Sequence, residues 1–404
     1  MDTKYKSTSE TIFKARHLLV LMLVFAVIYF LGAHEGIYYS DDLAYSEFAG
    51  RLVNGTFDVT DNGHTFIHRP TVFVPISILY HLFGVNILTY SFWPFLCTIG
   101  CIYITYKVAH QHDLNAAVAS VFLAFTFYFI YFINFLYPDN IVAFFVLIAA
   151  STYFSVLYGE NNKHLFKAIV FTTSLFLAGL TKETAVVVLP FFMYHAIRAF
   201  MKRSALQKFW VYSLVTGLVL LLSYFTWYYI ETGDPFYRIS EMEKANMVYD
   251  NYLNNPSKSY FPRLTVAPIE VLISTGSFIT LIFLLGGEKM LEDTDLKKKY
   301  YWLFLFLTAY LTLNFSSTSL SVYNPIKLDA RMFNLVLPAL AISASYGFNK
   351  KLNSIKFTLA YTLIFSLTAI YLTNKVGVIY GLLALYFAAH AAWLYFGYTL
   401  NLTK

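Results

Sequence analysis

Long apolar runs, each bounded by a short polar turn, recur along the whole chain. Each run has about 15–22 residues, close to the roughly 20 that an α-helix needs to cross a bilayer. The composition agrees, because 58% of the 404 residues are hydrophobic and only 13% are charged, whereas soluble domains are about 45–50% apolar. The pattern predicts an all-α polytopic membrane protein and excludes a soluble globular fold.

The runs and the charge of the turns between them predict about twelve transmembrane helices with both termini inside. In this topology 19 of the 29 Lys and Arg residues lie in cytoplasmic segments, as the positive-inside rule requires. The first run follows basic residues and has no small-residue cleavage site, so it is expected to be a signal anchor. The expected spans are 17–33, 86–108, 115–134, 141–158, 167–180, 185–200, 209–230, 265–287, 300–314, 332–349, 355–373 and 377–398.

One apolar segment, Thr71–Gly84, is left out of this count. Pro75 interrupts it, and at about 14 residues it is too short to cross the bilayer. If it crossed, every later loop would invert and the charge bias would be lost, so we expect an interfacial or re-entrant helix on the outer side. Because no Gly/Ser linker occurs, residues 1–404 are expected to form one integral-membrane domain, with outer loops at 34–85, 231–264 and 314–331.

The first outer loop, 34–85, is densely charged and begins with Asp41 and Asp42. Two adjacent carboxylates beside a span are costly unless they are solvated, paired or bound to a metal. In one interpretation, one of them is a general base toward an acceptor hydroxyl, and the other positions it or binds a divalent cation. The alternative is a solvated loop start that caps a helix over Leu43–Val53.

His68-Arg69-Pro70 follows in the same loop, at the foot of the expected interfacial helix. An arginine fixed in front of a proline is well placed to bind a lipid phosphate through two hydrogen bonds. The alternative is an arginine that extends to the lipid headgroups.

Further acids and bases recur in the other outer turns, far apart in the sequence. In the simplest interpretation Glu183 only neutralises Lys182, and a random scatter of loop charges would also produce the pattern. Arg331 is a candidate second phosphate ligand. The residues concerned are Asp139 in the turn 137–140, Lys182 and Glu183 in the turn 181–184, and Lys327, Asp329 and Arg331 before the tenth span.

Several of these segments together resemble the membrane-embedded GT-C glycosyltransferases that use polyprenyl-phosphate sugars, typified by protein O-mannosyltransferases and the aminoarabinose transferase of lipid A. The segment SDDLAYSEFAG (40–50) is similar to the family's Asp-Glu-x-x-Tyr-x-x-x-Ala signature, which implies that Asp41 is the catalytic aspartate. Asp42 replaces the usual Glu, and Tyr45 falls on the signature tyrosine. HRPTVFVPISILYHLFGVN (68–86) resembles the family's basic-Pro-Pro segment, with Arg69 at the basic position and Thr71 replacing the second Pro.

Later segments follow the order of the family's motifs. YPDN (137–140) resembles the acidic turn of the second outer loop, with Asp139 on its carboxylate, and LTKETAVVVLP (180–190) resembles the Lys-containing turn. ARMFNLVLPALAISASYG (330–347) is similar to the late Arg-to-Pro helix. His68 stands where some members have a metal-binding Glu, so a divalent metal ion is a candidate cofactor and no cofactor is firmly implied. Cys97 and Cys101 lie four residues apart in an apolar run, a spacing that favours packing.

The location of the charged residues limits which sugar donors can reach the site. Nucleotide sugars are cytoplasmic, whereas the charged residues are expected outside, so an activated sugar has to arrive in the membrane, as a polyprenyl (undecaprenyl) phosphate sugar does. We expect an inverting transfer to an acceptor hydroxyl, with Asp41 as base and with Arg69, Lys182, Arg331 and Lys327 around the leaving phosphate. Tyr45, His68 and Glu183 are expected in supporting roles.

The chain has no soluble acceptor-binding domain, which favours a lipid-linked or polysaccharide acceptor, such as O-antigen or another envelope glycan, in a bacterial inner membrane with the site facing the periplasm. Membrane lipids are the other expected partners, and a nucleic acid is not, because the basic residues lie in loops between spans. Two rivals stay open: a polyprenyl-linked glycan polymerase or ligase, and a lipid-sugar transporter or flippase. A transporter is expected to carry charged or broken segments near the middle of the bilayer, whereas the charges here lie in loops.

Overall fold

The computed structural model describes residues 2–34, 36, 41–61, 65–110, 116–159, 163–249 and 260–402. Within these ranges the regular structure is helical, and the sole β-pairing is an isolated bridge between Ser317 and Pro325. The all-α fold class is therefore confirmed. The α-helices are α1 (Asp2–Gly32), α2 (Asp41–Val53), α3 (Pro70–Phe83), α4 (Ile87–His110), α5 (Ala116–Ala124), α6 (Phe127–Tyr131), α7 (Pro138–Tyr158), α8 (His164–Thr181), α9 (Leu189–Met201), α10 (Gln207–Thr232), α11 (Tyr237–Tyr249), α12 (Tyr260–Leu264), α13 (Ala267–Ser274), α14 (Phe278–Leu284), α15 (Asp293–Phe315), α16 (Leu337–Ser345), α17 (Phe348–Leu352), α18 (Ile355–Tyr371) and α19 (Lys375–Leu402).

Short 3₁₀ helices join several of these elements: η1 (Thr65–His68), η2 (Phe132–Asn134), η3 (Glu183–Val188), η6 (Glu288–Met290) and η7 (Ala330–Phe333). Six helices of the described chain are long and apolar enough to cross a membrane, and the number rises to eight if each of two bent pairs is one span. The bends are 73° between α5 and the α6–η2 segment and 109° between α13 and α14. All twelve expected spans fall mainly on helical residues. The chain is therefore a multi-pass integral membrane protein.

The helix expected over Thr71–Gly84 is present as α3, with Pro70 in its first turn and Pro75 inside it. It is shorter than the helices that qualify as spans. The helix packs against α2, α4 and α8, and the indole nitrogen of Trp93 donates a hydrogen bond of 3.0 Å to the Thr71 carbonyl. This packing fixes the first outer loop against the bundle.

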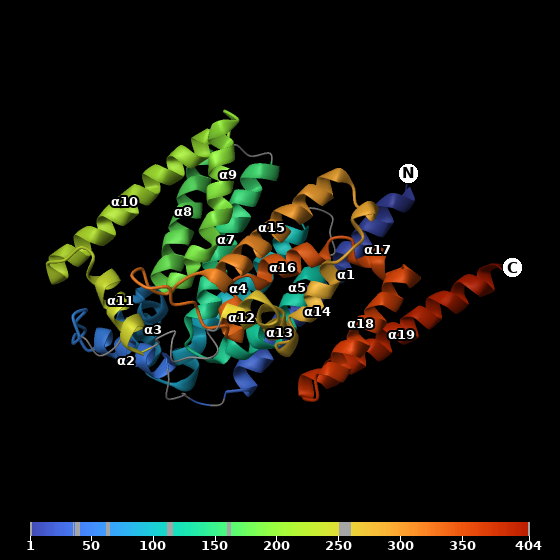
Figure 1. Cartoon of the computed structure of the whole chain (residues 1–404), viewed down its shortest axis with the longest axis horizontal. Helices are drawn as coiled ribbons and strands as arrows, with labels where there is room; N and C mark the ends of the chain where they lie inside the picture. The colour runs from blue at the N-terminus through green and yellow to red at the C-terminus, as the bar shows by residue number, and fades with distance from the viewer. Residues whose placement is uncertain are drawn as a thin grey trace.

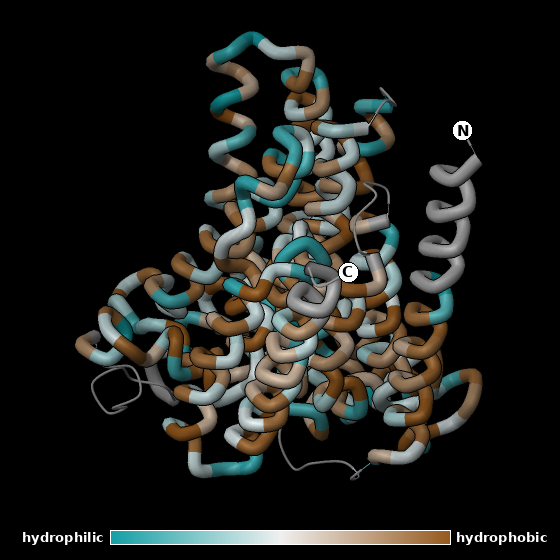
Figure 2. The backbone as a smooth tube through the Cα atoms, turned by 90° about the vertical axis from the view of Figure 1, so that its right-hand side faces the viewer, coloured by the Kyte–Doolittle hydropathy of each residue, from teal (hydrophilic) through white to brown (hydrophobic). Residues whose placement is uncertain are grey.

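The remaining arrangement determines where the loops meet. Helices α4, α7, α8 and α10 pack in sequence, α15 packs against α16, and the hairpin of α18 and α19 lies to one side (Figure 1). Figure 2 shows that apolar residues dominate the helices, while hydrophilic segments gather at many turns and helix ends. Because α7 and α8 run in opposite directions, the start of α7 and the end of α8 lie at the same end of the bundle. The outer turns predicted to carry function are thus brought together.

Candidate active site

Most of the acidic residues singled out in the sequence occupy the starts of helices. Asp41 and Asp42 open α2, Asp139 follows Pro138 in the first turn of α7, and Glu183 opens η3. A helix N-terminus stabilises negative charge because its first amide groups are unpaired and its dipole is positive there. The local sequence therefore places these carboxylates beside the unpaired amide groups at the starts of helices.

Three residues form what we call the arginine–glutamate bridge: Arg69, Glu183 and Arg238. The Arg69 guanidinium donates to Glu183 Oε2 at 2.7 Å, and Arg238 donates to Glu183 Oε1 at 2.5 Å. Arg69 also donates to the hydroxyl of buried Tyr45 at 2.8 Å and lies over the Phe66 ring at 4.8 Å. One carboxylate thus holds two guanidinium groups side by side, and the bridge carries a net charge of one positive unit.

Five further residues form a second group, which we call the aspartate cluster: Asp41, Asp42, Asp139, Lys182 and Arg331. Arg331 donates to Asp41 at 2.9 Å and lies over the Tyr137 ring at 4.8 Å. Lys182 donates to Asp139 at 2.6 Å, and Tyr90 donates to Asp42 at 2.8 Å. Since Lys182 and Glu183 are neighbours in sequence, the two groups adjoin.

The exposure of the three aspartates separates their roles. Asp42 is fully buried and the Asp139 side chain is 3% exposed, whereas the Asp41 side chain is 21% exposed. A general base has to reach the proton that it removes. Asp41 is therefore the aspartate of the cluster that a substrate can approach, and Asp42 and Asp139 are internal ion or hydrogen-bond partners.

Burial and ion pairing have opposite effects on the pKa values of the basic residues of the site. Burial alone would lower the pKa of Arg69, but Glu183 and Tyr45 raise it above its usual value. The same holds for Arg331, whose pKa is raised by Asp139 and Asp41. For Lys182 burial prevails, and its pKa is lowered despite the Asp139 carboxylate. Both arginines are therefore permanent cations, and at Lys182 the Asp139 carboxylate offsets part of the effect of burial.

His68 lies beside the bridge and is held neutral. It is buried, and its Nδ1 atom is 3.1 Å from the Tyr228 hydroxyl. Burial, together with the nearby Arg238, lowers its pKa to about 4. The expected supporting role of His68 thus becomes one of packing and hydrogen bonding in the wall of the site.

These contacts do not fit a metal ion. Among the described residues, no three His, Cys, Asp or Glu side chains lie close enough together to hold one. The candidate ligands are held by other protein groups, since Asp41 meets Arg331, Asp42 meets Tyr90 and His68 meets Tyr228. We therefore derive no step through a metal.

Three predicted site residues belong to neither group, while the structure adds residues that the sequence did not indicate. The Tyr45 hydroxyl accepts a hydrogen bond from Arg69, and His68 lies beside the bridge. Lys327 is exposed and makes no ion pair with any residue that the structure describes. Arg238 was missed because a single basic residue in the long loop 231–264 has no motif around it. Asn140 was also missed: its side chain donates to Thr98 and accepts from buried Asn334 at 2.8 Å. This amide pair ties the start of α7 to η7 and so sets Asp139 and Arg331 side by side.

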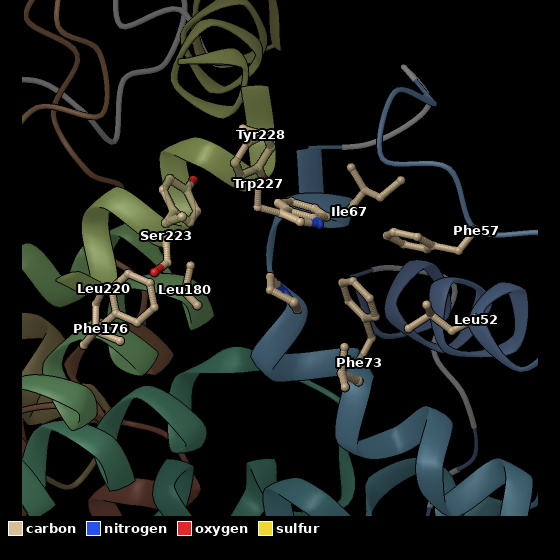
Figure 3. Close-up of a pocket in the computed structure, with 13 residues that line it drawn as sticks. Leu52, Phe57, Ile67, Phe73, Phe176, Leu180, Leu220, Ser223, Trp227 and Tyr228 are labelled. Carbon is tan, nitrogen blue, oxygen red and sulfur yellow. The ribbon is translucent and has the colours of Figure 1, made fainter. Parts of the chain in front are cut away.

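An apolar cavity of about 450 Å³ opens beside the bridge (Figure 3). Ile67 and Pro70, on either side of the His68-Arg69 pair, line it together with Phe73 of α3. Trp227 and Tyr228 of α10 form the facing wall, and the Tyr228 hydroxyl contacts His68. The polar headgroup of a lipid whose apolar chain filled this cavity would lie next to Arg69 and Arg238.

Comparisons with known proteins relate the chain to one family model and to solved structures of the same fold. Residues 67–229 match the family model of dolichyl-phosphate-mannose-protein mannosyltransferases, a span that includes Arg69, Asp139, Lys182 and Glu183. Among curated proteins, no sequence matches the chain.

Two solved structures of ArnT from Cupriavidus metallidurans are similar to the chain. With ArnT bound to undecaprenyl phosphate the TM-score is 0.54 at 15% identity, over 95% of this chain and 72% of ArnT. With the apo state it is 0.57 at 15% identity, over 96% and 76% of the two chains. The chain has the GT-C fold. A weaker likeness, with a TM-score of 0.46 at 11% identity, covers 94% of this chain and 54% of the oligosaccharyltransferase AglB from Archaeoglobus fulgidus.

The resemblance to GT-C glycosyltransferases inferred from the sequence is thereby confirmed. In the GT-C fold of this chain, the motif residues Asp41, Arg69, Asp139, Lys182 and Arg331 all gather at one end of the bundle through the contacts described above. The enzyme class expected from the sequence, a transferase that uses a lipid-phosphate-linked sugar, is also the class of the matching family model.

Proposed function

We propose that the chain is an inverting glycosyltransferase that moves a sugar from a polyprenyl-phosphate donor to an acceptor hydroxyl. One observation carries the proposal: an accessible carboxylate, Asp41, lies at the same end of the bundle as a pair of buried arginines beside an apolar cavity. The arrangement provides a base, an anion site and a lipid site. These are the three parts that transfer from a lipid phosphate requires.

The donor occupies the cavity side of the site in this proposal. Its prenyl chain lies in the apolar cavity between α3 and α10, and its phosphate meets Arg69, with Arg238 as a second guanidinium. Two forked guanidinium groups suit phosphate oxygens better than two ammonium groups do. The undecaprenyl phosphate in the ArnT complex, whose fold this chain shares, supports a donor of this class.

The reaction then follows from the charges. Asp41 removes the proton of the acceptor hydroxyl while the hydroxyl oxygen forms a bond to the anomeric carbon. The bond between that carbon and the phosphate oxygen breaks, and its electron pair stays on the phosphate, where Arg69, Lys182 and Arg331 stabilise the added charge. Arg331 has a second role, because its hydrogen bond to Asp41 holds the carboxylate in a fixed orientation. A single displacement of this kind inverts the anomeric centre.

The proposal also specifies the membrane, the side on which the site lies and the acceptor. The excess of basic residues in the alternate loops supports a site on the non-cytoplasmic side of the membrane, and we propose a bacterial inner membrane with the site facing the periplasm. Lys327, which is exposed, is proposed as a contact for the donor phosphate or its lipid neighbours. We propose a lipid-linked or polysaccharide acceptor, with O-antigen or another envelope glycan as the first candidate.

The test is the loss of one glycan modification with Asp41→Asn. Cells that lack the chain and carry a plasmid copy of the wild type or a variant are compared by mass spectrometry of their envelope glycans. We expect Asp41→Asn to remove the added sugar while the protein level stays unchanged, because the amide cannot accept the proton. The matched control is Glu47→Gln on the same helix, an exposed carboxylate that pairs with Arg51 of that helix, which should leave transfer intact.

Two outcomes would count against the proposal. Near-normal glycan modification by Asp41→Asn would remove its base. A change in chain length of an existing glycan, without loss of a side sugar, would favour the polymerase or ligase alternative.

A further inference from the structure

A second, smaller hollow lies at the end of the bundle opposite to the candidate active site. It has a volume of about 280 Å³ and lies between α7, α9 and the turn that leads into α10. Tyr153 and Tyr158 of α7 line it, whereas Asp139 of the aspartate cluster lies at the start of the same helix. At 1.5 Å per residue, Tyr153 is about 20 Å along the helix from Asp139. The hollow is therefore separate from the active site.

The wall of this hollow contains polar atoms that have no hydrogen-bond partner in the described structure. Tyr153 is fully buried, and its hydroxyl lies near the Trp210 indole N–H without a hydrogen bond of standard geometry, while the Nε2 atom of His195 has no hydrogen-bond partner among the described residues. The two rings pack edge to face at 5.2 Å, and both residues line the hollow. Buried polar groups are almost always hydrogen-bonded in folded proteins. These two atoms therefore point to a polar ligand that the hollow accepts.

The mouth of the hollow is positively charged. Arg198 and Lys202 are four residues apart at the end of α9, so both lie on one face of the helix. No carboxylate among the described residues forms an ion pair with either of them, and the contact of Arg198 with the Tyr194 hydroxyl, at 3.5 Å, is long. The hollow thus has two cations without a described acidic partner at its mouth, and the Tyr153 hydroxyl and the His195 imidazole in its wall. This set of groups suits a phosphate or another oxyanion.

The surface next to the mouth decides between a dissolved anion and a lipid. Ile197, Phe200 and Met201 are exposed on α9 around Arg198 and Lys202, with 55%, 40% and 79% of their surface accessible. In a protein that spans the membrane, such a face lies against acyl chains. We propose that the hollow binds the phosphate headgroup of an anionic membrane lipid, with the phosphate between Arg198 and Lys202 and a lipid oxygen hydrogen-bonded to Tyr153.

Native mass spectrometry of the purified full chain tests this proposal. The protein is released from nanodiscs of phosphatidylcholine that contain a fraction of phosphatidylglycerol, and the lipids that stay bound are counted. We expect wild type to retain one phosphatidylglycerol in preference to phosphatidylcholine. The double variant Arg198→Gln, Lys202→Gln should weaken this retention by about tenfold or more, since two charge-assisted hydrogen bonds are lost.

Two further variants separate a built site from general charge. Tyr153→Phe removes one oxygen and keeps the ring, so it should reduce retention of phosphatidylglycerol while the melting temperature without added lipid stays close to that of wild type. Lys107→Gln removes one positive charge from α4, away from the hollow, and should leave retention unchanged.

Three results would overturn the proposal. The first is equal retention by wild type and the double variant. The second is a loss with Lys107→Gln as large as that of the double variant, which would show that any surface cation serves. The third is displacement of the bound lipid by millimolar inorganic phosphate, which would assign the hollow to a dissolved anion. None of these readouts depends on sugar transfer, so they stay informative if the proposed activity is wrong.

Discussion

The candidate active site and the hollow at the opposite end handle positive charge in different ways. In the active site every base of the two groups is paired with an acid, and most of these side chains are buried. Around the hollow the two cations are exposed and lack an acidic partner among the described residues. The pairs of the active site are Arg69 and Arg238 with Glu183, Lys182 with Asp139, and Arg331 with Asp41.

The difference follows from the cost of burying charge. An ion inside protein or lipid is strongly destabilised unless a counter-ion and hydrogen bonds replace its water. The active site needs several ions at fixed positions before the substrate arrives, because such preorganisation is what stabilises a developing charge. The hollow has cations at the membrane edge, where water or a lipid headgroup supplies the counter-charge. Pairing thus indicates preorganised chemistry, and its absence indicates a site for an incoming anion.

The largest expected effect comes from breaking one internal pair. Lys182→Met leaves the Asp139 carboxylate buried without its cation, which should lower the free energy of unfolding by about 3–5 kcal/mol. The same change at the other end, Lys202→Met, should cost within about 0.5 kcal/mol, as surface substitutions usually do. Thermal or denaturant unfolding of the purified protein measures both. If the two variants were equally stable, the Lys182–Asp139 pair would not support the fold.

A matched double variant makes this test sharper. Adding Asp139→Leu to Lys182→Met removes the stranded carboxylate, so part of the lost stability should return, although transfer activity should not. A double variant that is less stable than Lys182→Met alone would show that Asp139 has a structural partner other than the lysine.

The next effect is a dependence of stability on pH at His68. Its pKa in the folded protein is about 4, whereas an unfolded histidine has a pKa of about 6.5. Between these values the unfolded chain binds the extra proton, so stability is constant above about pH 6.5 and falls as the pH is lowered toward 4. The difference of about 2.5 units corresponds to about 3 kcal/mol.

His68→Gln, which keeps a hydrogen-bonding group for Tyr228, should flatten the melting-temperature profile between pH 6.5 and 4. The variant has no titrating imidazole, so the proton that destabilises the wild type has no place to bind. An unchanged profile would show that other groups account for the acid sensitivity.

A smaller effect, on the affinity for undecaprenyl phosphate, is expected from substituting Arg238, which is paired with Glu183, and none from substituting Arg198 at the hollow. Arg238→Lys keeps the charge but loses the guanidinium Nη2 group that donates to both Glu183 and the Gly179 carbonyl. We expect the affinity for undecaprenyl phosphate, measured by native mass spectrometry, to fall by about tenfold. Arg198→Lys at the hollow should leave that affinity unchanged. Equal effects of the two variants would place the donor phosphate away from the bridge.

The sequence predicted the helices well, for physical reasons, and the structure brings most of the expected site residues close together. A transmembrane helix is determined by the length and hydrophobicity of its own segment, so the long runs could be assigned one at a time. The motif order then indicated Asp41, Arg69, Asp139, Lys182 and Arg331, and the structure gathers all of them at one end. Their individual roles remain a proposal.

The sequence could not provide the pairing of these residues. The simplest interpretation joined Lys182 to its neighbour Glu183, but the chain turns at this point and sends them to different partners, Asp139 and the two arginines. Arg238 could not be identified, because it reaches Glu183 through the fold of α11 and not through a motif. Likewise, the difference in exposure between Asp41 and Asp42 depends on how α2 rotates against Tyr90 of α4. Such relations are set by tertiary packing.

The smallest effect that we predict concerns the helix that carries Arg238. Glu243, on the same helix α11, accepts hydrogen bonds from the hydroxyls of Ser319 and Ser321 and from the backbone N–H of Leu320 at 2.9 Å. These donors lower the pKa of Glu243 to about 2, so the carboxylate is ionised at neutral pH. Its contribution to the stability of the folded protein is lost only as the pH falls through that value. The contacts tie α11, and with it Arg238, to the loop before η7.

Glu243→Gln should loosen this tie without touching the bridge itself. Because the contacts are exposed, we expect only about a twofold loss of affinity for undecaprenyl phosphate, together with faster cleavage of the loop around Leu320 in limited proteolysis. Glu241→Gln, which changes a carboxylate paired with Lys244 on the same helix, is the control and should alter neither. The protease could instead cleave the Glu243→Gln variant at the wild-type rate while the variant binds the lipid as weakly as Arg238→Lys does. That result would show that Glu243 acts on the donor phosphate through its charge and not by holding α11.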